Sequence, residues 1–163
     1  MLTPEQLVIL KSAILAETDP TFVGYRTNGQ NTLMAAWFNG AAVPEVVVWR
    51  STVGKDEITQ NGFDWTRLDN LSVGKARVWD AMFDNASRSM NPSKPNVRAG
   101  IDSVWVGTAS DLAVRAAVYV HCKRSATRGE KLYAAGSGTT LSPSTMSFEG
   151  GITDNDVQNA LAS

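Results

Sequence analysis

The hydrophobic positions near the start of the chain recur at spacings of three and four residues, the period of an amphipathic helix. Leu7, Leu10 and Ile14 mark one face of this helix. Thr3 and Gln6 have the spacing of a capping box, in which each side chain accepts a hydrogen bond from the other residue's backbone N–H. The pattern therefore predicts a first helix from about residue 3 that ends near residue 19, where a proline follows.

Three shorter elements are predicted next. A helix covers about residues 30–38 and stops at Gly40. Residues 44–53 contain the one cluster of β-branched residues; propensity favours a buried strand, and an irregular helix entry is the alternative. The segment after this strand fits a short helix that stops at the turn pair Asn61-Gly62.

Residues 61–85 combine tryptophans with acids and bases. The spacing of the apolar residues indicates whether these polar residues form a functional site or the solvated face of a packed helix. Ser72 is in position to cap a helix that extends to about residue 85, with apolar residues such as Trp79 and Phe83 at helical spacing. The charged residues fall mostly on its other faces. We interpret this stretch as a leading loop and an amphipathic helix. A further helix is predicted from about residue 94 to 106.

The longest periodic segment covers about residues 109–135. Thr108 and Asp111 form a capping arrangement at its start, and Gly136 stands where a helix ends. A loop then contains one short strand near residues 146–149, and Thr153 begins a last short helix.

The predicted fold class is mainly α. It is a compact helical bundle with a long helix in the C-terminal half, a short β element and an extended C-terminal arm. The predicted domains are a helical domain of residues 1–136 and a loop and arm of residues 137–163.

Length and charge limit the classes of function. At 163 residues the chain can form one domain with a buried core. A net charge of −1 does not by itself favour nucleic acid or an anionic membrane. One cysteine excludes an internal disulfide, and one histidine leaves a zinc site mostly to carboxylates. The first residues do not resemble a signal peptide, and no apolar run is long enough to cross a bilayer, so we expect a soluble protein with no membrane partner.

The residues that suggest chemistry do not form a recognisable catalytic set. His121 and Cys122 are adjacent, but consecutive side chains on a helix point about 100° apart and do not face one another. The segment "GSGTT" lacks the Lys-Ser/Thr ending of a phosphate-binding loop. The acids of residues 56–69 have spacings that are common on surfaces. We therefore predict no enzymatic activity, no cofactor and no metal.

The charge pattern of the C-terminal half is more informative. Residues 112–135 contain five bases and one acid, Glu130, whereas no lysine or arginine follows Gly136. On a continuous helix Arg124, Arg128 and Lys131 share a face. This face either binds phosphate, meets an acidic partner such as the tail of a neighbouring copy, or is simply solvated; of the two binding interpretations we prefer the protein partner. The residues of the predicted interface are Arg115, Lys123, Arg124, Arg128, Lys131, Glu149, Asp154 and Asp156.

Glycines interrupt three predicted helices. Gly74, Gly100 and Gly129 each cost about 1 kcal/mol relative to alanine inside a helix. Close approach of another backbone is the usual reason for such glycines, and a misplaced helix boundary is the alternative.

A series of segments resembles a family of small proteins encoded among the virion genes of tailed bacteriophages. The segments are "VVVWRSTV", "NGFDWTRLDNLSVGKARVWDAMF", "KPNVRAGIDSVWVGT", "HCKRSATRGEKLYAAGSGT" and "MSFEG". They cover most of the chain from Trp49 to Gly150, and the chain is similar in them to head–tail connector, or adaptor, proteins.

This resemblance implies a structural protein of the virion neck that assembles in the cytoplasm of the bacterial host. It implies a homo-oligomeric ring of twelve copies docked under the portal protein, with tail or neck proteins on the other side. Genomic DNA would pass through the channel without specific binding. The alternatives are a tail-terminator or other neck or minor capsid protein and, in a different class, a small DNA-binding regulator.

Overall fold

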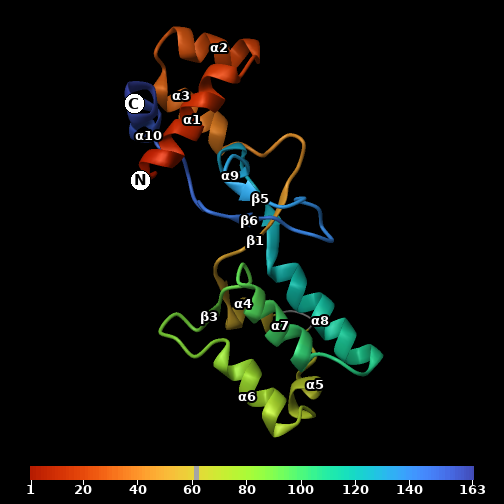
Figure 1. The fold of residues 1–163 in the computed structure, drawn as a ribbon. Coiled ribbons are helices and arrows are strands. Elements are labelled where there is room, and N and C mark those ends of the chain that lie inside the picture. The colour runs from red at the N-terminus through yellow and green to blue at the C-terminus, as the bar shows by residue number, and fades with distance from the viewer. Residues whose placement is uncertain (61–62) are drawn as a thin grey trace. The chain divides into compact units, whose positions relative to one another are not determined.

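The computed structural model describes residues 1–60 and 63–163 of the chain, and these residues are mainly helical (Figure 1). The predicted stop at Asn61-Gly62 lies outside the described residues. The helices are α1 (Pro4–Ala16), α2 (Pro20–Thr27), α3 (Asn31–Asn39), α4 (Lys55–Ile58), α5 (Trp65–Asp69), α6 (Val73–Ala81), α7 (Pro95–Val104), α8 (Ala109–His121), α9 (Arg128–Lys131) and α10 (Asp154–Ala162).

Six short strands pair into three two-stranded antiparallel sheets among the described residues. The pairs are β1 with β4, β2 with β3, and β5 with β6. The strands are β1 (Val47–Trp49), β2 (Val53–Gly54), β3 (Ser89–Met90), β4 (Lys123–Ser125), β5 (Ala134–Ala135) and β6 (Thr145–Met146). The strand predicted within residues 44–53 is present in shorter form as β1, whereas the strand predicted at residues 146–149 overlaps β6 only at Met146.

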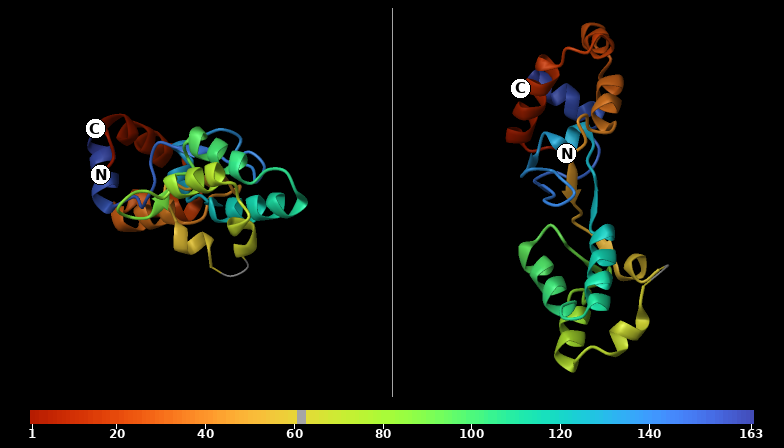
Figure 2. Two further views of the ribbon diagram at one scale, coloured as in Figure 1. Left: turned by 90° about the horizontal axis from the view of Figure 1, so that it is seen from below. Right: turned by 90° about the vertical axis from the view of Figure 1, so that its right-hand side faces the viewer.

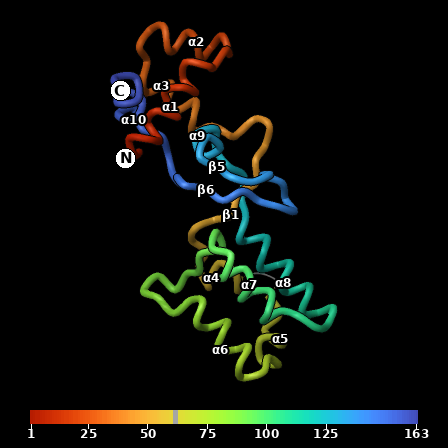
Figure 3. The backbone as a smooth tube through the Cα atoms, in the orientation of Figure 1, coloured from red at the N-terminus to blue at the C-terminus, as the bar shows by residue number. Residues whose placement is uncertain are grey.

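The chain divides into two compact units. Unit 1 consists of residues 1–48 and 125–163, and unit 2 consists of residues 49–124. Unit 1 therefore contains both the first and the last helix, which Figure 3 shows in red and blue. The predicted division into a helical domain of residues 1–136 and a loop and arm of residues 137–163 stays a prediction.

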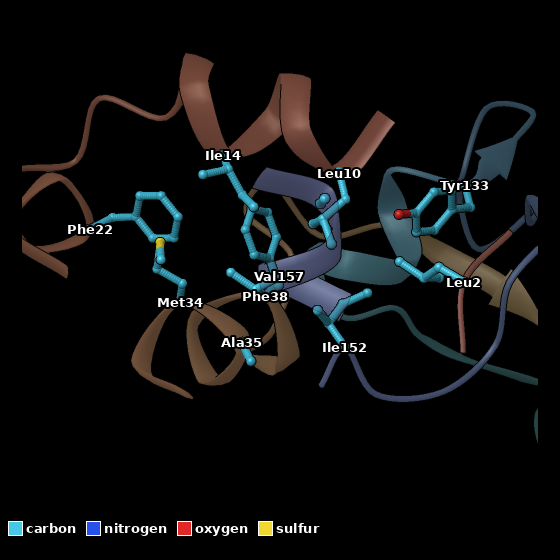
Figure 4. Packing of buried hydrophobic residues seen from close by; sticks show 11 residues of the cluster. Leu2, Leu10, Ile14, Phe22, Met34, Ala35, Phe38, Tyr133, Ile152 and Val157 are labelled. Carbon is cyan, nitrogen blue, oxygen red and sulfur yellow. The ribbon is translucent and has the colours of Figure 1, made fainter. Parts of the chain in front are cut away.

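The core of unit 1 brings the two ends of the chain together. Helix α10 packs against α1 and α3, and the side chains of Leu10, Ile14, Phe38 and Val157 meet between them (Figure 4). Asn39 fixes the segment before α10, because its amide donates to the Ile152 carbonyl and accepts from the Ile152 N–H, both at 2.8 Å. The prediction of an extended C-terminal arm is therefore wrong.

The core of unit 2 is aromatic. Trp79 of α6 and Trp105, which follows α7, are both fully buried, and their rings lie 5.2 Å apart in an edge-to-face arrangement. Phe83 packs edge-on against Trp79 at 5.1 Å. Figure 2 shows α6, α7 and α8 of this unit from two further directions. Residues 61–85 thus contribute core residues, as the pattern of hydrophobic positions predicts.

The predicted helix starts are confirmed where a side chain caps the helix. Thr3 and Gln6 form the capping box of α1, and Thr108 and Asp111 form that of α8. Ser72 accepts a hydrogen bond from the Lys75 N–H at the start of α6. The sequence pattern missed α2 and α5, which are short and begin at Asp19 and Asp64 caps.

The predicted long helix of residues 109–135 is wrong. Helix α8 ends at His121, and the next residues form strand β4, which pairs with β1. Thr127 and Glu130 then form a new capping box that starts α9. Local periodicity cannot show that a strand from elsewhere in the chain takes the backbone hydrogen bonds of residues 123–125.

Candidate functional site

Four side chains of unit 2 form a cluster that we call the aromatic–basic cluster: Trp49, Arg98, Tyr119 and Lys123. The Arg98 guanidinium lies 4.8 Å from the centre of the Trp49 ring. The Lys123 ammonium lies 5.2 Å from the Trp49 ring and 5.6 Å from the Tyr119 ring. Both cations are close enough for cation–π attraction, which holds positive charge against an aromatic surface.

The cluster is fixed by hydrogen bonds. Arg98 donates to the backbone carbonyls of Pro92 and Ser93 at 2.6 and 2.9 Å. The Tyr119 hydroxyl donates to the Asp102 carboxylate at 3.0 Å. Burial and this bond to a negative group raise the pKa of Tyr119, so its hydroxyl stays protonated. The cluster is thus a positioned surface whose only ionised members are cations.

A second polar group of unit 2 surrounds the one histidine. Arg50 donates to the Glu57 carboxylate through both terminal nitrogens, and it also donates to the His121 carbonyl at 3.0 Å. The hydrogen bonds from Arg50 outweigh burial and lower the pKa of Glu57. His121 Nδ1 lies 3.9 Å from the same carboxylate. Because Glu57 is engaged by Arg50, this group is foremost an ion pair that holds α4 near the end of α8.

Cys122 does not serve as a nucleophile paired with His121. The thiol is fully buried, and burial raises its pKa to about 12. At neutral pH it is therefore a neutral thiol inside the core of unit 2. The structure agrees with the interpretation of this cysteine as a core residue.

The predicted basic face depended on one continuous helix, which the described residues do not form. Arg124 belongs to strand β4, whereas Arg128 and Lys131 belong to helix α9. The Arg128 guanidinium stacks on Trp37 at 4.3 Å from the ring centre and donates to the Trp37 carbonyl at 3.1 Å. Lys131 donates to the Val43 carbonyl at 3.2 Å. These two bases therefore stabilise unit 1 from within.

The other predicted interface residues are also separate. Arg115 of α8 lies 3.6 Å from Asp102, beside the aromatic–basic cluster. Glu149 and Asp154 are exposed in unit 1. Asp156 is only 2% exposed and accepts hydrogen bonds from Thr153. Of the eight residues, Lys123 belongs to the aromatic–basic cluster and Arg115 lies beside it.

Two exposed apolar helix faces were not predicted as functional. The α1 outer face comprises Val8, Ile9 and Leu15 with the polar Ser12 among them, and the α8 outer face comprises Leu112, Ala113, Ala116, Ala117 and Val120. The sequence contains a sign of the first face, because "LVILKSAIL" is apolar on both sides of a helix rather than on one. Apolar surface of this kind marks an interaction site when it is contiguous.

The hollows of unit 2 lie beside these features or on α6. A hollow of about 210 Å³ adjoins the α8 outer face and is lined by residues that include Phe63, Ala113 and Ala117. Another, of about 410 Å³, has Lys55, Arg77 and Arg88 in its wall, but it also contains two acids, and Lys55 is paired with Asp80 at 2.8 Å.

The two units carry opposite formal charges. Unit 1 contains eight acidic and four basic side chains, a formal charge of −4. Unit 2 contains eight acidic and eleven basic side chains, a formal charge of +3. Together they give the −1 of the whole chain. The near-neutral total thus conceals a strong asymmetry.

Two further features of the described residues concern metal sites and membrane-spanning helices. The described part of the chain contains no group of three or more His, Cys, Asp or Glu side chains placed to hold a metal ion. In the same residues, no helix combines the length and apolarity required to cross a membrane.

Comparison with protein-family models, with curated proteins and with solved structures gave no match. The fold and its surfaces therefore define a class in structural terms only. It is a mainly helical protein of two compact, oppositely charged units, and helices of both units expose apolar side chains.

Proposed function

We propose that this chain is a structural virion protein of a tailed bacteriophage, a head–tail connector that forms a ring under the portal and extends the DNA channel towards the tail. The resemblance of the segments between Trp49 and Gly150 to connector proteins supports the phage origin. In this proposal the protein is not an enzyme and needs no cofactor.

The observation that carries the proposal is the opposite charge of the two units. Identical subunits in a ring meet through two different, mutually complementary surfaces, since each copy contacts one neighbour with one surface and the next neighbour with another. A unit of charge −4 and a unit of charge +3 on one chain suit such a contact.

The pairing of the bases suits a channel through which DNA slides. Arg50 is paired with Glu57, Lys55 with Asp80, and Arg115 with Asp102. A base that is already paired offers less to a phosphate, so a surface of this kind attracts the backbone weakly. Passage of the genome without specific binding is therefore consistent with the arrangement of unit 2.

The residues of the predicted interface divide into two roles in this proposal. Arg115, Lys123 and Arg124 belong to unit 2 and are assigned to contacts with the portal or a neighbouring copy. Glu149 and Asp154 are assigned to the acidic side of such a contact. Arg128, Lys131 and Asp156 shape unit 1 and act on the interface only by holding that unit together.

A DNA-binding regulator is the second candidate, and the aromatic–basic cluster favours it. Arginine and lysine beside aromatic rings also occur on surfaces that bind nucleic acid. Against it, unit 2 has an excess of only three bases over acids, and Arg50, Lys55 and Arg115 are paired with carboxylates.

Native mass spectrometry of the purified protein with the portal of the same phage tests the proposal. A connector forms a complex in which several copies bind one portal ring, and the complex is unaffected by an excess of duplex DNA. A protein that ignores portal and binds duplex DNA with strong salt dependence would instead be a regulator.

A further inference from the structure

Helix α1 exposes an apolar face on the side opposite to its core residues. Leu10 and Ile14 of this helix are fully buried in unit 1. On the outer side, Val8 is 56% and Leu15 58% exposed, and Ile9 lies next to Val8. A surface helix of a monomer normally places polar residues there. The outer side of α1 therefore exposes branched apolar side chains that this unit leaves uncovered.

Helix α8 exposes a second apolar face, of a different shape. Val114 and Val118 are buried in unit 2, whereas Leu112 is 42% and Val120 72% exposed. Between these two side chains the exposed positions are alanines, and the hollow of about 210 Å³ adjoins them. The α8 outer face has no charged residue and is low in relief at its centre.

The two faces are complementary rather than alike. The α1 face has exposed branched side chains. The α8 face has alanines between two larger residues, and a hollow lined by Phe63 and Asp64 adjoins Ala113 and Ala117. Helices pack when the ridges of one enter the grooves of the other. An α1 face therefore fits an α8 face better than either fits a copy of itself.

Charge favours the same pairing. Glu5 is exposed in the first turn of α1, in the unit of charge −4. Arg115 lies on α8, in the unit of charge +3, and Arg67 and Lys75 act electrostatically on Asp111 at its start. Like faces would bring together two acidic or two basic units, which costs free energy. The unlike faces bring opposite charges together.

We propose that the occupant of each face is a second copy of this chain, with the α1 outer face of one copy packed on the α8 outer face of the next. This is a heterologous contact, in which every copy uses one face as donor and the other as acceptor. The inference deepens the proposed function by naming the surfaces of the subunit contact, and it rests on that function only for the closure of the chain of contacts into a ring.

Two variants of the full chain block one face each. Val8→Glu with Leu15→Glu places charge on the α1 outer face, and Ala116→Glu with Val120→Glu places charge on the α8 outer face. All four positions are exposed in the monomer, so the variants should fold. A control, Leu141→Glu, places the same charge at a more exposed apolar residue of a loop in unit 1.

Sedimentation velocity over a wide concentration range measures the assembly. We expect wild type and the Leu141→Glu control to form species larger than the 17.5 kDa monomer. Each blocked variant alone should be monomeric, with self-association weakened by at least about tenfold, because the contact would bury an unpaired charge. A mixture of the two blocked variants retains one intact contact and should form a one-to-one heterodimer but nothing larger.

Other results would overturn the inference. A wild-type protein that stays monomeric at every concentration, or a blocked variant that still assembles alone, rules out the heterologous contact. A mixture of the two blocked variants that stays monomeric also rules out this contact. Circular dichroism of each variant distinguishes a lost contact from a lost fold. Portal binding by a wild-type monomer would leave the proposed function in place while removing this inference, so the two fail separately.

Discussion

The Asp156 carboxylate accepts a hydrogen bond from the backbone N–H of Leu2 at 3.1 Å, which joins the last helix of the chain to the residues before the first. The same carboxylate accepts from the Thr153 N–H and hydroxyl at 3.0 and 2.6 Å. A residue predicted to meet a neighbouring subunit therefore caps α10 and closes unit 1. The C-terminal segment acts as part of a folded unit that presents α1.

Asp156 should make the stability of unit 1 depend on pH. Burial alone would raise the pKa of Asp156, but the hydrogen bonds from Thr153 and Leu2 outweigh it and lower the pKa. A lowered pKa in the folded state stabilises the fold above the unfolded value of about 3.9, and this contribution is lost as the pH falls through the folded value. Asp156→Asn should therefore cost about 1–2 kcal/mol at pH 7 and flatten the acid dependence.

Urea unfolding followed at several pH values between 2 and 7 measures this effect. Exposed Asp154, in the same first turn of α10, supplies the control substitution Asp154→Asn. Equal acid dependence of wild type and Asp156→Asn would contradict the assigned role of the carboxylate.

Gly129 and Gly74 should respond in opposite ways to alanine. A Cβ at Gly129 would lie 2.8 Å from Ile152 Cγ1 and 3.3 Å from the Phe38 carbonyl oxygen. A Cβ at Gly74 would meet nothing within 4 Å. We expect Gly129→Ala to destabilise the protein by about 1–3 kcal/mol through overpacking. Gly74→Ala should stabilise it by about 0.4–1 kcal/mol.

Thermal and urea denaturation of the two variants give the comparison. A destabilised Gly74→Ala, or a Gly129→Ala as stable as wild type, would disagree with the packing described for these glycines.

The Cys122 thiol should be inert in the folded protein. Full burial and a pKa raised to about 12 leave almost no accessible thiolate at pH 8. We expect a disulfide reagent to label Cys122 only at the rate at which unit 2 opens, so that urea accelerates labelling in step with unfolding. Rapid labelling without denaturant, monitored by absorbance, would show that the thiol is exposed.

Arg128 should contribute to stability rather than to a contact between subunits. It stacks on Trp37 and donates to the Trp37 carbonyl, so Arg128→Ala removes a cation–π contact and a hydrogen bond. We expect a loss of about 1–2 kcal/mol in the free energy of unfolding. Arg77→Ala, at an exposed arginine of α6, is the control and should stay within about 0.5 kcal/mol of wild type.

Urea unfolding monitored by tryptophan fluorescence measures both variants. An Arg128→Ala protein that unfolds like wild type but no longer assembles would restore the original prediction of an interface role.

The features that depend on neighbouring residues could be predicted from the sequence. The Thr3 and Thr108 caps are examples, because a capping box involves residues only three positions apart. The burial of Trp79 followed from helical periodicity in the same way.

The features that depend on distant parts of the chain could not be predicted. Residues 123–125 look helical locally, but they pair with β1 across more than seventy residues of sequence. The bond between Leu2 and Asp156 spans almost the whole chain. The charge interpretation of residues 112–135 placed Arg124 and Arg128 on one face because it assumed a continuous helix. Since that helix is absent, placing them on one helix face was wrong as well.

The central claim, that this chain is a structural component of the virion, is tested most directly by its copy number in purified phage particles. Quantitative mass spectrometry with labelled peptides of this chain and of the portal gives the ratio of the two. We expect a fixed ratio near one ring of copies per portal ring in tailed particles. Particles that lack the chain altogether would contradict it.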